Sequence, residues 1–199
     1  MKLNIGCGGD IKKGWVNCDL IDDPDGPRVD MVFDASRIPL PFDDNSVDEI
    51  LLSHVLEHIP TWESTVTDIA RILKPGGLLT VRVPYGVNFT SYHVRFFGPE
   101  TLDIFIQNGR NVQSAAFNNC HQVPFLDPPF RLMKREIRYG FWFGWHLNHY
   151  LHISYFQGRT WKWPVFKRIE IIWILVKAPE KHERKLRLKR LIRNANKNR

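Results

Sequence analysis

A glycine turn and an acidic residue follow the first two apolar runs of the chain. Gly6-Cys7-Gly8-Gly9 comes directly after Leu3-Asn4-Ile5, and Asp19 closes the next run. Glycines after a strand let the backbone approach a ligand without a Cβ in the way, and an acidic side chain at the tip of the neighbouring strand can accept hydrogen bonds from ribose hydroxyls. The pairing predicts a site for a nucleotide-type cofactor. Dinucleotide enzymes usually have about twenty residues between turn and acid, so the shorter gap here predicts a short helix or an irregular loop.

His54, Glu57 and His58 form an H-x-x-E-H pattern, which is typical of inverted zinc peptidases. Two imidazoles and a further carboxylate could hold a zinc ion with one position open. The pattern, however, follows directly on the apolar run Ile50-Leu51-Leu52-Ser53. That context places His54 at the carboxyl end of a central strand, where open α/β sheets bind ligands. We expect His54 to contact the cofactor or the substrate and Glu57 and His58 to orient the loop, and we predict no metal site.

Short apolar runs and one amphipathic stretch predict the elements that position these residues. The runs 16–20, 29–33, 47–52 and 78–83 are short and β-branched enough for parallel strands that are buried on both faces. A helix is predicted to begin after Thr61, which can cap it, and to end at Lys74-Pro75-Gly76-Gly77, because its apolar residues fall on one face at helical spacing. A second helix is predicted from Pro99 to Gly109. Strands that alternate with helices imply a doubly wound sheet.

Six segments of the chain share a register with one known family. They are Leu3-Asn4-Ile5-Gly6-Cys7-Gly8, Gly14-Trp15-Val16-Asn17-Cys18-Asp19, Asp34-Ala35, Leu40-Pro41-Phe42-Asp43-Asp44-Asn45-Ser46-Val47-Asp48, His54-Val55-Leu56-Glu57-His58 and Arg71-Ile72-Leu73-Lys74-Pro75-Gly76-Gly77. With these segments, residues 1 to about 110 resemble the class I S-adenosylmethionine-dependent methyltransferases of the methyltransferase type 11-like group. The resemblance implies an α/β fold with a doubly wound, mostly parallel Rossmann-like sheet. It also implies a terminal antiparallel strand pair, which the sequence places at 131–139 and 168–176.

The same resemblance implies S-adenosyl-L-methionine as the cofactor. In that family, backbone around the glycine turn approaches the methionine part of the cofactor, the first acidic residue holds the ribose, and the second accepts a hydrogen bond from the adenine amino group. Asn4 departs from the pattern, because many methyltransferases have an acidic residue there. The residues that the resemblance assigns to the cofactor are Gly6, Cys7, Gly8, Asp19, Leu20, Asp34, Ala35, Ser53 and His54.

The acceptor side has several candidate residues. Methyl transfer needs in-line positioning of the reacting atoms, and it also needs a base if the acceptor is a hydroxyl. His54 and His93 are the catalytic candidates, and Tyr85 and His121 are candidates for the acceptor pocket. Asp127-Pro128-Pro129-Phe130 resembles the Asp-Pro-Pro-Tyr/Phe signature of enzymes that methylate nucleobase amino groups, but the residues before it are too polar for a buried strand. A proline-stiffened loop is the better interpretation.

The composition is that of an ordinary globular protein, except that the last residues of the sequence are strongly basic. The chain has 199 residues, 43% of them hydrophobic, so one methyltransferase domain over residues 1–179 with a basic tail over 180–199 is expected. The net charge is +7, but residues 181–199 hold nine Lys or Arg and one Glu, so the remainder is nearly neutral. Three cysteines form neither an even disulfide set nor a CxxC pair, and the first residues lack a secretory signal. These features favour a cytoplasmic location.

Two segments suggest contacts beyond a small acceptor. Residues 140–164 are crowded with aromatic residues, and 139–158 contain no Asp, Glu, Lys or Arg. The three histidines His146, His149 and His152 would drift around a helix, so we expect an amphipathic helix over the sheet or active site and not a metal site. In the tail, apolar residues share a helical face with Lys and Arg around them, which suits anionic lipid or nucleic acid. Peripheral membrane contact through 140–164 and 181–199 is therefore one hypothesis, and a solvated tail is the other.

Three functions follow from these observations. The favoured one is an S-adenosylmethionine-dependent methyltransferase that acts on a small or carrier-linked acceptor, at oxygen in preference to nucleobase nitrogen, with a sugar or lipid-linked substrate as the leading class. The second is a non-catalytic domain that keeps the cofactor fold and binds a membrane or a partner through the aromatic segment and the tail. The third is an RNA methyltransferase whose tail holds phosphates.

Overall fold

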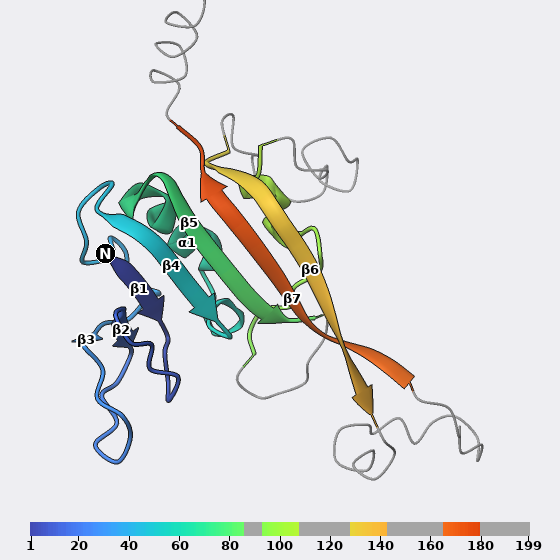
Figure 1. The fold of residues 1–199 in the computed structure, drawn as a ribbon, viewed down its shortest axis with the longest axis horizontal. Coiled ribbons are helices and arrows are strands. Elements are labelled where there is room, and N and C mark those ends of the chain that lie inside the picture. Colours follow the sequence, from blue (N-terminus) through green and yellow to red (C-terminus); the bar gives the residue numbers. More distant parts are fainter. Residues whose placement is uncertain (86–92, 108–127, 143–164, 180–199) are drawn as a thin grey trace, which may run out of the picture.

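Seven strands form one sheet in the computed structural model of the protein, which describes residues 1–85, 93–107, 128–142 and 165–179 (Figure 1). The order of the strands across the sheet is β3-β2-β1-β4-β5-β7-β6. The elements along the chain are β1 (Lys2–Ile5), β2 (Val16–Asp19), β3 (Met31–Val32), β4 (Val47–Ser53), the 3-10 helix η1 (Leu56–His58), α1 (Trp62–Ile72), β5 (Leu73–Pro84), the 3-10 helix η2 (Thr101–Phe105), β6 (Phe130–Trp142) and β7 (Val165–Lys177).

The strand pairing confirms the predicted fold class. Strands β1 to β5 pair in parallel, and β7 is antiparallel to both β5 and β6. Since β1 lies between β2 and β4, the chain builds one half of the sheet outward to β3 and then crosses back to build the other half. Open α/β sheets bind ligands beside the carboxyl ends of the strands at such a reversal. The topology therefore directs attention to the ends of β1, β2 and β4.

Burial on both faces, as predicted, holds for β4, where the consecutive residues Ile50, Leu51 and Leu52 are buried, but β5 is buried more completely on one face. In β5, Leu79, Val81 and Val83 are buried and belong to the main apolar cluster, whereas the intervening Thr80 and Arg82 are only half-buried. Successive side chains of a strand point to opposite faces, so the alternation shows which face carries the core. The two residues of β3 are both exposed, which corrects the prediction of a buried strand over 29–33.

Helix α1 is confirmed by the structure, and it ties the loop after β3 to the core. Trp62 and Val66 are buried, and the Trp62 ring packs edge-on against Phe97 with the centroids 5.3 Å apart. The Arg71 guanidinium donates to the Phe42 carbonyl at 2.9 Å. Thr61 occupies the N-cap position but forms no side-chain capping hydrogen bond. Apolar burial, more than capping, therefore accounts for the helix.

The segment Lys74-Pro75-Gly76-Gly77 does not stand between a helix and a later strand as predicted. β5 begins at Leu73, directly after α1, and its pairing with β4 jumps from Val47↔Leu73 to Glu49↔Leu78. The four residues form an irregularity inside the strand. An insertion of this kind in one strand of a pair bends it locally without ending it.

The second predicted helix, from Pro99 to Gly109, is wrong in length and type over the described residues. The structure has only η2, which begins at Thr101 and ends at Phe105. Ile106 already forms a β-bridge with Phe130, and the Gln107 amide donates to the Phe130 carbonyl at 2.8 Å. Tertiary pairing with the start of β6 thus replaces the further turns of helix that the apolar spacing predicted.

The terminal strand pair is confirmed and is longer than predicted. β6 pairs with β7 from Phe130↔Lys177 to Trp142↔Val165, whereas β5 pairs with β7 only as far as Pro84↔Glu170. The end of the pair therefore projects beyond the carboxyl end of β5, as Figure 1 shows. Residues 143–164 and 180–199 lie outside the described residues, so the proposed helix, the tail and the division at residue 179 stay predictions.

Among the residues that the structure describes, no helix is long and apolar enough to cross a membrane.

Candidate functional site

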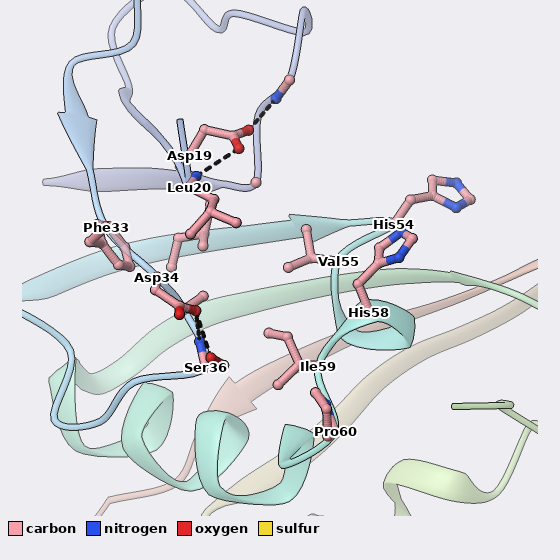
Figure 2. Close-up of a pocket in the computed structure, with 14 residues that line it drawn as sticks. Asp19, Leu20, Phe33, Asp34, Ser36, His54, Val55, His58, Ile59 and Pro60 are labelled. Atoms are coloured by element: carbon pink, nitrogen blue, oxygen red, sulfur yellow. Dashed lines mark hydrogen bonds between the residues drawn. The ribbon is translucent and has the colours of Figure 1, made fainter. Parts of the chain in front are cut away.

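A cavity of about 480 Å³ lies where the carboxyl ends of β1, β2 and β4 meet (Figure 2). Its volume is in the range of small-molecule and cofactor sites. Of the nine residues assigned to the cofactor from the sequence, seven line this cavity: Gly6, Gly8, Asp19, Leu20, Asp34, Ala35 and His54. Cys7 and Ser53 are adjacent in the chain but do not line it. The wall also contains residues that the sequence did not assign, among them Phe33, His58 and Ile59.

The glycine turn is tightly packed and its first two amides are used within the fold. The amides of Gly6 and Cys7 both donate to the Cys18 carbonyl, at 2.8 and 3.0 Å. Gly6 has φ +67°, and a Cβ built on it would lie 2.3 Å from Val55 Cγ2. A side chain is thus excluded by both backbone conformation and contact. What the turn offers a ligand is a close, Cβ-free approach at the end of β1.

The two cysteines beneath the turn are structural. Cys7 and Cys18 are buried, and burial is the main cause that raises the pKa of each thiol, for Cys18 to about 12. A thiol with so high a pKa stays protonated near neutral pH and is a poor nucleophile. The thiols therefore contribute to packing and not to chemistry.

Asp19 is held at the cavity by two backbone amides. Its Oδ2 accepts from the Gly8 amide and its Oδ1 accepts from the Leu20 amide, each at 2.7 Å. Each carboxylate oxygen can accept a second hydrogen bond. The carboxylate is thus fixed in orientation by the glycine turn and keeps capacity for two hydroxyl donors, which matches a ribose. Leu20 beside it is 60% exposed and provides an apolar wall.

A pair of asparagines that the sequence did not single out as a pair supports the turn from below. Asn4 on β1 donates from Nδ2 to the Asn17 Oδ1 at 3.1 Å and to the Asp10 carbonyl at 2.7 Å. Asn17 on β2 also accepts from the Lys12 amide at 2.8 Å, so its side chain ties both strands to the loop between them. Both residues are buried. Their signal in the sequence was amide residues inside otherwise apolar runs, including the Asn4 that replaces an acidic residue.

Asp34 and its neighbours form the opposite wall. Asp34 Oδ1 accepts from the Ser36 amide at 2.8 Å and from Ser36 Oγ at 2.6 Å, and the Ser36 hydroxyl is the main cause that lowers the pKa of Asp34. The carbonyl of Ala35 accepts from Thr65 Oγ1 at 3.0 Å, which anchors this loop to α1. The carboxylate therefore shapes its own turn, and its Oδ2 lies 3.4 Å from Arg37 Nε while keeping capacity to accept from a polar ligand edge beside the apolar Phe33.

His54 marks the other end of the cavity and has an unusual backbone. Its φ is +58°, a left-handed conformation that non-glycine residues rarely adopt and that often marks a functional site. Its Nδ1 lies 3.3 Å from Glu57 Oε1 and its Nε2 lies 3.1 Å from Glu170 Oε1. The contact with the Glu57 carboxylate is the main cause that raises the pKa of His54, with Glu170 adding to it against partial burial. Both ring nitrogens face carboxylates, so the geometry stabilises a positively charged imidazolium.

The remaining sequence candidates lie beside the cavity or outside the described residues. His93 packs edge-on against the cavity-lining His58, with ring centroids 4.9 Å apart, and does not line the cavity itself. Tyr85 is half-buried, forms a β-bridge with Phe97 and packs against the core. His121 lies outside the described residues. Glu170 was missed by sequence reasoning, because no local pattern connects it with the histidine that follows β4.

Comparisons with known proteins agree with this geometry. Residues 9–81 match the methyltransferase domain family. An uncharacterized methyltransferase of Mycobacterium tuberculosis is 44% identical over 54 residues, which are 27% of this chain and 21% of that protein. The chain thus matches about a fifth of the length of this curated relative.

Solved structures of low sequence identity share the fold. A protein described as a methyltransferase, in complex with a methyltransferase activator of Haloferax volcanii, is 16% identical, with a TM-score of 0.52 and coverage of 91% of this chain and 83% of that one. A protein from Bacillus halodurans, also described as a methyltransferase, is 15% identical, with a TM-score of 0.52 and coverage of 90% and 92%. The chain is thus similar to the methyltransferase domain family over residues 9–81, and its fold is shared with these solved structures.

Proposed function

We propose that the protein transfers the methyl group of S-adenosylmethionine to an oxygen of a small or carrier-linked acceptor. The observation that carries the proposal is the Asp19 carboxylate, which the Gly8 and Leu20 amides orient at the edge of a cavity of about 480 Å³. A fixed carboxylate beside apolar walls fits a nucleoside, because ribose hydroxyls donate hydrogen bonds and an adenine ring buries its faces.

The residues of the cavity suit distinct parts of the cofactor. Asp19 would hold the ribose hydroxyls, Leu20 and Phe33 would contact the adenine faces, and Asp34 would accept from the adenine amino group. The glycine turn, which is open beside Gly8, would admit the methionine part. When bound, S-adenosylmethionine supplies an electrophilic methyl group on a sulfonium, which needs an in-line acceptor and no further activation of its own.

The acceptor is expected at the His54 and His58 end of the cavity. Figure 2 shows these imidazoles at one end of the view and Asp19, Phe33 and Asp34 at the other. A hydroxyl acceptor must lose a proton as the new C–O bond forms. His54 serves as a base only when its ring leaves Glu57 or Glu170, since both nitrogens face carboxylates in this structure. We therefore propose His54 first as a residue that positions the acceptor.

The aromatic segment supports an acceptor with an apolar or sugar surface. The strand pair β6–β7 that leads into residues 143–164 projects beyond the carboxyl end of β5, which is the edge where the cavity opens. Aromatic side chains suit the faces of sugar rings and apolar chains. The non-catalytic and RNA-binding alternatives depend on this segment and on the tail, which both lie outside the described residues.

The test is binding followed by transfer. Calorimetry with the full chain should show S-adenosylmethionine binding that weakens in Asp19→Ala, and incubation with the methyl-labelled cofactor and cell extract should label a carbohydrate or lipid fraction. Labelling of protein-free RNA would favour the RNA alternative. Cofactor binding without any labelled product in extract would favour the non-catalytic domain, and absence of cofactor binding would refute the proposal.

A further inference from the structure

Three potential metal ligands from two distant segments meet beside the cavity. Glu57 and His58 belong to η1, and His93 follows in the segment that precedes η2. One ligand atom from each of these three residues lies within 4.8 Å of the other two. Ligand atoms about 2.0–2.2 Å from one cation lie at most about 4.4 Å apart, so small rotations of these side chains would bring all three atoms onto a single ion.

Glu57 carries the argument, because its carboxylate is buried without adequate partners. The residue is 0% exposed, and neither Oε1 nor Oε2 makes a hydrogen bond of acceptable geometry among the described residues. The nearest cationic group is His54 Nδ1, 3.3 Å from Oε1, which is ion-pair contact and leaves Oε2 unpaired. A buried carboxylate is costly unless it is paired or coordinates a metal. The position of Glu57 therefore calls for a second cation.

The main chain holds the three ligands together independently of any ion. The amides of Val94 and Arg95 both donate to the Glu57 carbonyl, at 2.9 and 3.2 Å. The Arg95 guanidinium donates to the Pro60 carbonyl at 2.7 Å. These bonds fix the segment after His93 against the loop that carries Glu57 and His58. A binding site needs such preorganisation, because it keeps the ligand residues in place before the ion binds.

We propose that Glu57, His58 and His93 form a site for a divalent transition-metal cation of the zinc or manganese type. Two imidazoles and one carboxylate are a donor set that binds such ions and leaves coordination positions open, whereas magnesium prefers oxygen donors alone. His58 is shared between this site and the cavity wall, so the open positions adjoin the acceptor end. This proposal differs from the prediction that the H-x-x-E-H pattern holds no metal, and it has His93 as a ligand in place of His54.

The role of the ion rests on the proposed function. A hydroxyl oxygen bound at an open position would be polarised and would lose its proton to water more readily. The oxygen then forms the C–O bond while the S–C bond of the sulfonium breaks, leaving a neutral thioether. This role suits the state of His54, whose ring nitrogens both face carboxylates. An acceptor with adjacent hydroxyls would be favoured, because two oxygens could occupy two open positions.

Direct metal binding tests the site without reference to activity. The full chain is stripped with a chelator, dialysed, and titrated with Zn²⁺, Mn²⁺ and Co²⁺ by calorimetry, elemental analysis and, for Co²⁺, the visible spectrum. We expect one equivalent to bind at the site and the affinity to fall at least about tenfold in His58→Ala and His93→Ala. A His149→Ala, His152→Ala double variant is the matched control, because residues 146–152 offer the chain's other closely spaced histidines, and it should retain that equivalent.

The outcomes separate this inference from the proposed function. Glu57→Gln is compared with His58→Ala. Glu57 is buried and His58 is exposed, so His58→Ala should fold even if Glu57→Gln does not. Equal metal affinity in the parent, His58→Ala and His93→Ala would overturn the site, even if S-adenosylmethionine still binds. If the unmutated protein binds metal but does not bind S-adenosylmethionine, the proposed function is refuted and the metal site is supported.

Discussion

The two ends of the cavity differ in how their polar groups are satisfied. At the Asp19 end, the carboxylate accepts two backbone amides and the buried Asn4–Asn17 pair links the strands beneath it. At the His54 end, a left-handed backbone carries an imidazole between two carboxylates, and Glu57 is buried with an unpaired oxygen. A region whose polar groups are all hydrogen-bonded within the protein keeps one geometry, which suits a ligand that is the same in every reaction cycle. The region with unmet bonding capacity is the one where a second component is expected.

Gly6→Ala should have the largest effect on stability, because it disrupts the glycine turn at the Asp19 end of the cavity. The substitution forces an alanine into φ +67° and places its Cβ 2.3 Å from Val55 Cγ2. We expect a loss of about 2–4 kcal/mol in the free energy of unfolding, measured by denaturant titration. Gly9→Ala is the control, because nothing lies within 4 Å of its built Cβ, and it should change stability by less than about 0.5 kcal/mol. Similar losses in both variants would contradict the close packing of the turn.

Addition of metal to the chelator-stripped protein should stabilise it through the proposed site at the His54 end of the cavity. At a free concentration of 100 times Kd, binding to the folded state alone contributes about 2.7 kcal/mol, or a rise in Tm of about 5–10 °C for a chain of this size. At the same metal concentration the rise should fall to about half or less in His58→Ala and His93→Ala, because their affinity is expected to be at least about tenfold lower. An unchanged rise in these variants would mean that the ion binds elsewhere.

Asp19→Asn should weaken S-adenosylmethionine binding while leaving the fold intact. Hydrogen bonds to a charged acceptor contribute about 1.5–3 kcal/mol, so the Kd should rise by roughly 10- to 150-fold in calorimetry. Asp25→Asn makes the same change of charge on the exposed loop between β2 and β3 and should leave the Kd unchanged. If the two variants bind alike, the assignment of Asp19 to the ribose is wrong.

Asn17→Ala should lower stability by about 1–2 kcal/mol, because it removes the acceptor of the Lys12 backbone amide and one of the two acceptors of the Asn4 side-chain amide. Asn4→Ala and the double variant complete a cycle in denaturant titrations. Residues in one network are coupled, so the double variant should lose less than the sum of the single losses. Strict additivity would show that the two side chains act independently.

The smallest effect is expected at the thiols under the turn. Burial raises the pKa of both Cys7 and Cys18, so near pH 8 neither forms much thiolate. In a Cys120→Ser background, a thiol reagent should label the folded protein slowly and the denatured protein at once. Rapid labelling of the folded chain would indicate that the turn opens and does not keep one geometry.

Local sequence patterns predicted those features, such as turns and strand ends, that are set by residues close together in the chain. The turn at Gly6 and the strand-end Asp19 were both recognisable, because a strand followed by glycine and a strand ended by an acid are sequence-local. The helix after Pro99 was predicted wrongly, since Ile106 leaves the helical path to pair with Phe130, and no helical periodicity contains that partner. Phe33 was missed as a cavity residue for the related reason that its run was assigned to a buried strand.

The sequence by itself determined the fold class and the glycine turn and Asp19 at one end of the cavity, because strand and turn signals act over a few residues and the order of elements follows from them. Only the tertiary structure decided the His54 end. It brought Glu170 on β7 to His54, directly after β4, across the sheet, and it set His93 against His58. Such meetings depend on strand register and on backbone bonds between distant segments, which no short spacing in the chain encodes.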